Sequence, residues 1–269
     1  MSNGLLKLRE REWGRRHWLP LVYRKTIRLR EIGPLVTFTF DDFPRTAYSI
    51  GGAILKSFGA CGTYYTSLGL MNTTDSTGDQ FHLDDLHGLV GDGHELASHT
   101  CHHVSSRTLS AAAFVQEVLE GKEGMRRVTG LKVSNNFAYP FGRVTAAAKC
   151  AVGKAMRSCR GSYPGVNGPL VDLSLLRANS LYGNTERLGV IRRLFQQGQE
   201  RGGWLIFYTH DVRNDHSSWG CTPRLFEAAV KLALSSSMKI LTVKEVLGDP
   251  QTEFSQQGRS KGLVQESFG

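Results

Sequence analysis

From residue 35 onward, short apolar runs alternate with longer stretches in which apolar residues recur at helical spacing. The apolar runs predict strands, and several are almost continuously hydrophobic, which is typical of parallel strands buried on both faces. The predicted strands are residues 35–40, 63–67, 95–99, 133–139, 157–162, 173–180, 204–209 and 239–243. The predicted helices are residues 47–58, 110–128, 145–156, 186–197 and 223–234. This alternation predicts an α/β fold, either a parallel sheet or a (β/α) barrel.

The two ends of the chain differ in composition from this alternating region. Residues 1–34 contain nine Lys and Arg but three acidic residues, and so carry six of the nine net positive charges. Residues 252–269 are rich in Gln, Ser and Gly and contain few large apolar groups. We therefore expect a basic N-terminal arm over residues 1–34, a folded body over residues 35–247 and a flexible tail over residues 248–269.

The basic arm also contains Trp13, Trp18 and Leu21, so it could lie on an anionic membrane surface. A solvated arm that packs partly on the body is the alternative. The body is nearly balanced in charge, whereas a nucleic-acid-binding domain concentrates its basic residues on the folded part. We expect no nucleic acid partner and keep peripheral membrane contact through the arm as a hypothesis.

The rest of the composition bears on the compartment. No apolar run reaches the roughly 18 residues of a membrane span, and residues 1–16 lack the apolar stretch of a signal peptide. The five cysteines are scattered and form no Cys-x-x-Cys pair. This pattern argues against a disulfide framework and against a thiolate zinc site. We expect a cytoplasmic protein, with the inner face of the membrane as the alternative.

An acidic pair follows the first predicted strand, because residues 35–40 run directly into Asp41 and Asp42. The carboxyl ends of strands are where α/β barrels place their active sites. Adjacent residues that leave a strand point in different directions, so one carboxylate could bind a metal while the other acts as a general base. An Asp-Asp pair is also a common turn element, so the pair alone does not distinguish a functional site from an ordinary turn.

A histidine-rich segment follows the third predicted strand. If the chain turns helically there, His99 and His103 are four residues apart and can face one point. Two imidazoles and one carboxylate form an open catalytic site for zinc or another first-row divalent ion. A histidine-rich loop by itself is as consistent with a solvated surface, but together with the acidic pair it favours a metal site. We expect His94 and His102 to lie outside the ligand set.

These motifs resemble those of the NodB-like polysaccharide deacetylases, carbohydrate esterase family 4. Residues 39–42 match the family's Thr-Phe-Asp-Asp motif, and residues 99–103 match its His-Thr-x-x-His motif. Residues 137–142 resemble the third motif, and residues 205–211 resemble the late strand that ends in histidine. The resemblance covers residues 35–246 and implies a distorted (β/α) barrel of about seven parallel strands, so that residues 35–247 would be the catalytic barrel.

The resemblance also implies roles for single residues. A divalent metal, commonly zinc in this family, would be bound by Asp42, His99 and His103. Asp41 would be the general base, and His210 would be the general acid that protonates the leaving amine. Further residues would line the site, either near a backbone N–H group for the oxyanion or at the acetyl pocket: Tyr139, Phe141 and Tyr208.

The chain departs from the family pattern in two places. Ala138 stands where the third motif often has an Arg that supports the catalytic base, which is similar to a branch without that Arg. Residues 157–168 contain no Asp followed by Trp, so the fourth motif is missing and the group that orients His210 is open.

The resemblance implies a metal-dependent hydrolase that removes N-acetyl groups from amino sugars of a glycan or glycolipid precursor. Hydrolysis of O-acetyl esters or removal of formyl groups by the same centre is the alternative among enzymes. A catalytically silent carbohydrate-binding barrel is the alternative outside them, since the third-motif Arg and the fourth motif are missing.

Overall fold

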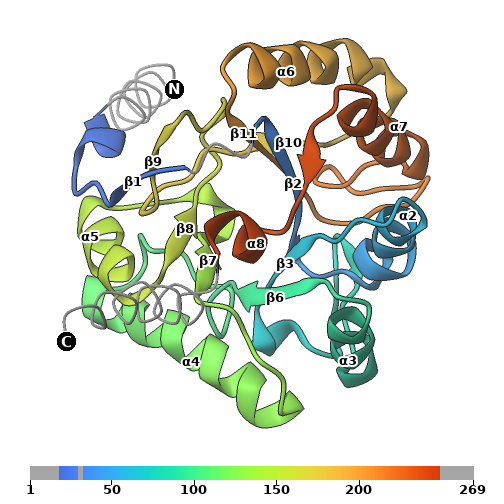
Figure 1. Ribbon diagram of the computed structural model, residues 1–269. Coiled ribbons are helices and arrows are strands. Elements are labelled where there is room, and N and C mark those ends of the chain that lie inside the picture. Colours follow the sequence, from blue (N-terminus) through green and yellow to red (C-terminus); the bar gives the residue numbers. More distant parts are fainter. Residues whose placement is uncertain (1–17, 30–32, 249–269) are drawn as a thin grey trace, which may run out of the picture.

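The first long strand, β2 (Leu35–Asp42), is buried over its whole length and lies in the middle of a sheet. The protein is described by a computed structural model that covers residues 18–29 and 33–248 (Figure 1). Seven strands follow one another around the sheet in the order β10 (Asn179–Ser180), β11 (Trp204–Thr209), β2, β3 (Thr63–Thr66), β6 (Glu95–Ser98), β7 (Asn136–Ala138) and β8 (Ser158–Arg160). All neighbouring pairs are parallel, and β12 (Lys239–Ile240) also pairs with β2. The expected distorted barrel of about seven parallel strands is confirmed.

The sheet curls until its two edges approach each other. A parallel bridge joins Arg160 at the end of β8 to Leu176, which lies on the chain that leads into β10. Cys159 adds two backbone hydrogen bonds, one to Leu173 and one from Leu176. The barrel therefore closes through a few bonds to an irregular segment rather than through a full ladder.

Helices surround the curled sheet (Figure 1). They are α2 (Ala53–Ser57), α3 (Leu83–Gly91), α4 (Ala111–Thr129), α5 (Ala146–Ala155), α6 (Leu188–Glu200), α7 (Pro223–Ser235) and α8 (Val243–Leu247). Side chains of Ser110, Thr145, Thr222 and Thr242 cap four of these helices by accepting a hydrogen bond from the first turn. An aromatic core formed by Phe38, Phe207 and Phe226 ties α7 to β2 and β11.

Short α8 closes the amino end of the barrel, in the centre of Figure 1. Its first backbone N–H groups bond to the first residues of two strands, since Val243 donates to Thr63 Oγ1 and Lys244 donates to Glu95 Oε2. The other end, where the strands terminate, remains available for a site.

Two of the predicted strands are wrong in extent. Residues 173–180 do not form one strand, because the chain turns after β9 (Leu170–Asp172) and only β10 rejoins the sheet. Residues 239–243 form a strand only as far as Ile240, since Thr242 and Glu245 build a capping box that starts α8. The predicted helix 47–58 begins as a π-helix over Ala47–Gly52 before it continues as α2.

The described part of the basic arm packs on the body. β1 (Thr26–Arg28) pairs antiparallel with β9, and Leu19 is buried. The buried ammonium group of Lys149 donates to the carbonyl oxygens of Leu19 and Val22 and to the carboxylate of Asp172. Trp13, with the rest of residues 1–17, lies outside the described residues, as do residues 249–269. No helix in the described ranges is long and apolar enough to cross a membrane.

Candidate active site

The strand ends at the carboxyl side of the barrel bring the predicted site residues to one rim. Asp41 and Asp42 end β2, His99 follows β6 and His210 follows β11. Asp42 has φ of 65° and His103 has φ of 50°, which is the left-handed region that residues with a side chain rarely adopt. Such conformations cluster at functional sites because the surrounding structure must maintain them. Here they turn the two aspartates apart and aim both histidines at Asp42.

Asp42, His99 and His103 form one group whose ligand atoms all lie within 4.8 Å of one another. Asp42 Oδ1 is 3.0 Å from His103 Nε2 and 3.4 Å from His99 Nε2. His210 approaches from the opposite side of the carboxylate, with its Nε2 3.6 Å from Asp42 Oδ2.

The hydrogen bond at the far side of the ring fixes which nitrogen of His99 faces the group. His99 Nδ1 lies 2.9 Å from the carbonyl oxygen of Ala138. Because a carbonyl only accepts, Nδ1 carries the proton and Nε2 presents a lone pair toward Asp42. Burial lowers the pKa of His99 to about 4, so the ring is neutral at pH 7, which is the form that binds metals.

Asp42 and the histidines around it change one another's pKa. Burial favours the neutral acid at Asp42, but contact with His103 and the charges of His210 and His99 outweigh it, so the pKa of Asp42 is well below its usual value. Burial likewise opposes the charged form of His103, yet the contact with Asp42 and the charges of both aspartates raise its pKa. Asp42 is therefore an anion over the whole physiological range.

This group fits a divalent metal by a test that does not depend on resemblance. Asp42 Oδ1 is buried, and no donor in residues 18–29 and 33–248 meets the geometry of a hydrogen bond to it; its nearest neighbours are the imidazole nitrogens of His103 and His99. A buried anionic oxygen without a donor is costly unless a cation satisfies it. One carboxylate and two imidazoles are a donor set suited to zinc and other first-row divalent ions, with positions left open for water or substrate.

Asp41 points away from this group and is paired with Arg160. The Nη2 group of Arg160 donates to both carboxylate oxygens of Asp41, and both side chains are buried. The guanidinium carbon of Arg160 also lies 5.1 Å from the ring centre of Tyr65 and 5.0 Å from that of Tyr208. Burial opposes the charge of Arg160, but the carboxylate of Asp41 outweighs it and raises the pKa of the guanidinium.

Arg160 explains the missing arginine of the third motif. It lies on β8 directly beside Ala138 of β7 in the parallel register. The sequence motifs do not point to Arg160, although an arginine inside a predicted buried strand is a signal in itself, because such a charge needs a partner.

His210 is oriented by a backbone carbonyl rather than by a fourth-motif carboxylate. Its Nδ1 lies 3.1 Å from the carbonyl oxygen of Trp219. Asp211, fully buried, holds that loop closed by accepting hydrogen bonds from Ser217 N and Arg213 Nε. Gly220 is required there, since a Cβ at this position would lie 2.3 Å from Asp211 Oδ1.

The three residues that were expected to line the site differ in their position and exposure. Phe141 is 58% exposed, and its ring centre is 4.5 Å from that of His103. Tyr208 is half-buried against Arg160. Tyr139 does not line the site: its ring packs between Phe114 and Phe137, and its N–H donates to the carbonyl oxygen of Arg160.

The barrel thus has an acid pair and two converging histidines at its carboxyl rim. Residues 30–157 match the family model of polysaccharide deacetylases. The predicted resemblance to carbohydrate esterase family 4 is thereby confirmed. No curated protein matches the chain significantly.

Solved structures of the same fold are distant in sequence. A chitin deacetylase from the fungal pathogen Colletotrichum lindemuthianum is 20% identical over 84% of this chain and 92% of that chain, with a TM-score of 0.57. A peptidoglycan deacetylase from Bacillus subtilis is 13% identical over 89% of this chain and 100% of that chain, with a TM-score of 0.51. A pseudoenzyme of carbohydrate esterase family 4 is 16% identical over 82% of this chain and 70% of that chain, with a TM-score of 0.52. Since a pseudoenzyme shares the fold, the fold alone does not decide whether this chain is catalytic.

Proposed function

We propose that the protein is a divalent-metal-dependent hydrolase that removes N-acetyl groups from amino sugars of a glycan or glycolipid precursor. The observation that carries this proposal is the convergence of Asp42, His99 and His103 at the barrel rim, with Asp41 on one side and His210 on the other. A binding module without catalysis has no need for both a buried acid and a histidine around such a group.

The metal, which is zinc in this proposal, would be bound by Asp42, His99 and His103. When bound, it polarises the acetamide carbonyl and makes a coordinated water more acidic. Ala138 takes part indirectly, because its carbonyl oxygen orients His99.

Asp41 accepts the proton of the attacking water in this proposal. Arg160 keeps both oxygens of Asp41 in place by donating a hydrogen bond to each of them. A general base of this kind contributes roughly a hundredfold to ten-thousandfold in rate.

His210 supplies a proton to the leaving amine. The Trp219 carbonyl accepts from Nδ1, so the protonated ring presents its Nε2–H to the site. Phe141, whose ring lies next to that of His103, and Trp219, whose carbonyl oxygen contacts His210, are 58% and 54% exposed, so apolar faces of sugar rings could pack on them.

The substrate's location is the least supported part of the proposal. Cytoplasmic location and membrane contact through residues 1–34 stay predictions. In the described part of that arm, Trp18 is 45% exposed and Leu21 is 73% exposed, which is compatible with either alternative.

The test measures acetate and free amine released from chitooligosaccharides by chelator-treated protein before and after zinc is restored. We expect one zinc per chain and metal-dependent release of both products. His103→Ala should lose stoichiometric zinc, because two remaining ligands compete poorly with water. His102→Ala is the matched control, since this neighbouring histidine is exposed and hydrogen-bonded to Glu117.

The alternatives give different results in the same assay. Release of acetate only from O-acetyl esters, or of formate from N-formyl sugars, would replace deacetylation of amino sugars by one of the other two reactions. Full zinc binding without turnover on any of these substrates would identify a silent barrel. Equal zinc occupancy in both histidine variants would refute the assigned ligands.

A further inference from the structure

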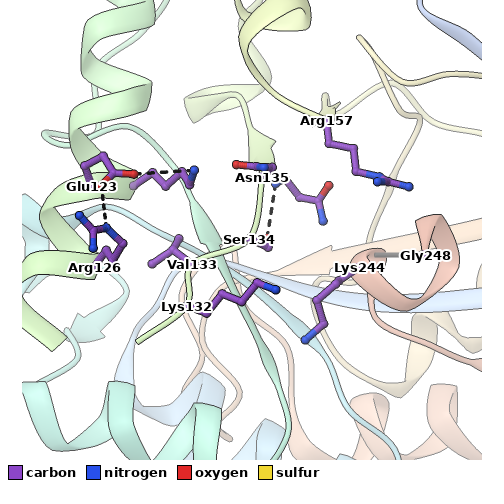
Figure 2. Close-up of a pocket in the computed structure, with 11 residues that line it drawn as sticks. Glu123, Arg126, Lys132, Val133, Ser134, Asn135, Arg157, Lys244 and Gly248 are labelled. Carbon is purple, nitrogen blue, oxygen red and sulfur yellow. Dashed lines mark hydrogen bonds and ion pairs between the residues drawn. The ribbon is translucent and has the colours of Figure 1, made fainter. Parts of the chain in front are cut away.

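A second cavity lies at the opposite end of the barrel from the candidate active site. Its lining includes Asn136, the first residue of β7, and Arg157, which directly precedes β8. Lys244 and Gly248 of the α8 region complete one wall, and α4 forms another (Figure 2). The cavity has a volume of about 270 Å³. Because the acidic pair and the histidines stand at the carboxyl ends of the strands, a molecule in this cavity cannot be the one that they process.

The lining of this basal pocket is strongly cationic. Five of its eleven residues are basic and one, Glu123, is acidic: Lys122, Arg126, Lys132, Arg157 and Lys244 are the basic residues. Glu123 is already engaged, since it accepts from Arg126 at 2.7 Å and lies 3.8 Å from Lys122. Figure 2 shows Lys132 and Lys244 on the side of the pocket that faces away from this acidic residue, with Arg157 near Gly248.

The buried carboxylate of Glu95 near the pocket does not cancel this charge. It is 2% exposed and receives hydrogen bonds from Asn136 Nδ2, Thr63 Oγ1 and the backbone N–H of Lys244. Among the described residues around the pocket, five basic side chains stand against two acidic ones, Glu95 and Glu123. Cations placed around one cavity repel each other, and an anion between them would remove that repulsion.

We infer that the basal pocket binds a phosphate-bearing anion. Its basic residues come from three separate parts of the chain, namely α4, the segments that lead into β7 and β8, and α8, and they surround a volume of small-molecule size. A nucleic acid site would instead present its basic residues as a stripe along one open face. Phosphate offers several acceptor oxygens and close to two charges, and Arg and Lys are its usual protein partners. The polar side chains of Ser134 and Asn135 provide further contacts to such oxygens.

The probe is inorganic pyrophosphate, titrated calorimetrically into the full chain. Lys132→Gln combined with Lys244→Gln removes two charges from the pocket, and both residues are exposed, so the fold should tolerate the change. Arg193→Gln combined with Arg224→Gln is the control, because it removes two exposed charges from α6 and α7 on the other side of the barrel. We expect the pocket variant to bind pyrophosphate at least about tenfold more weakly than the parent chain, and the control to bind as the parent does.

Further arms identify the source of the phosphate. Phosphatidylglycerol vesicles that sediment the parent chain but not the pocket variant would indicate a lipid headgroup, whereas pyrophosphate binding without sedimentation would indicate a free anion. No binding of either probe by the parent chain would overturn the inference, as would equal weakening in the two variants. Acetate release should be unchanged in both, because the active site lies at the other end, and this readout separates failure here from failure of the proposed activity.

Discussion

The two ends of the barrel differ in how their charged side chains are arranged. At the carboxyl rim, the ionisable groups are buried and each has a charged partner a few ångströms away, as Asp41 has Arg160 and Asp42 has its histidines. At the basal pocket, five basic side chains and one acidic side chain, Glu123, stand around a solvent-accessible cavity, so cations are in excess in its lining. Removal of a charge should therefore destabilise the rim, where it strands a buried partner, and should relieve repulsion at the base.

The largest effect should come from Arg160. Arg160→Met leaves the buried carboxylate of Asp41 without its partner, and we expect a loss of about 3–5 kcal/mol in the free energy of unfolding. Urea denaturation measures this loss. Adding Asp41→Asn should recover much of the stability without restoring turnover. A single variant as stable as the parent chain would show that the pair contributes little to the fold.

A second effect concerns turnover, which is measured at a temperature at which the variants remain folded. Asp41→Asn should reduce the rate of acetate release by at least about a hundredfold while zinc remains bound, because the base is lost but the ligands are not. Asp84→Asn, an exposed acid on α3, is the control and should have the parent rate. Near-normal turnover of the first variant would assign the base to another group.

A third prediction uses pH and a buried histidine away from the rim. Burial lowers the pKa of His94 to about 4, so between that value and the unfolded value of 6.5 the unfolded chain binds more protons. The contribution of His94 to the free energy of unfolding is therefore complete above pH 6.5 and decreases as the pH falls toward 4. At pH 5 this loss is about 2 kcal/mol. His94→Asn keeps an acceptor for the Gly62 N–H and should flatten the decline between pH 7 and 5. His87→Asn should leave this decline unchanged. If the free energy of unfolding depends on pH in the same way in the parent chain and both variants, the lowered pKa of His94 is contradicted.

The smallest effect should appear at the base. Lys244→Gln removes one of several like charges around the pocket, so we expect a gain of about 0.3 kcal/mol in the free energy of unfolding at low salt. The same change at Lys231 of α7 breaks its pair with Glu227 and should cost a similar amount. Losses in both variants would mean that the basal cations are not in mutual repulsion.

Much of the fold could be predicted because its signals are local. The apolar runs around β2, β3, β6 and β11 predict buried parallel strands, and the motifs predict which strand ends meet. The strands near the closing edge could not be predicted, since β9 and β10 are only two or three residues long and depend on contacts with distant segments. The apolar residues within 173–180 are buried because they pack against the core, not because they form one strand.

The site was predictable only in part for the same reason. The structure brings Asp42, His99 and His103 together, as their spacing suggested, while their roles stay predictions. The pairing of Asp41 with Arg160 spans 119 positions and leaves no trace in local spacing. The carbonyl of Trp219 is equally invisible, because any residue type can supply a backbone oxygen to His210.

The position of Arg160 beside Ala138 has a consequence for how such enzymes are recognised. In a parallel sheet, in-register residues of neighbouring strands project to the same side, so a side chain can be exchanged between strands without leaving its row. Along the chain, position 138 is an alanine; across the sheet, an arginine stands in the same row on the neighbouring strand. A search that compares rows of a sheet would retain chains that a linear motif discards as defective.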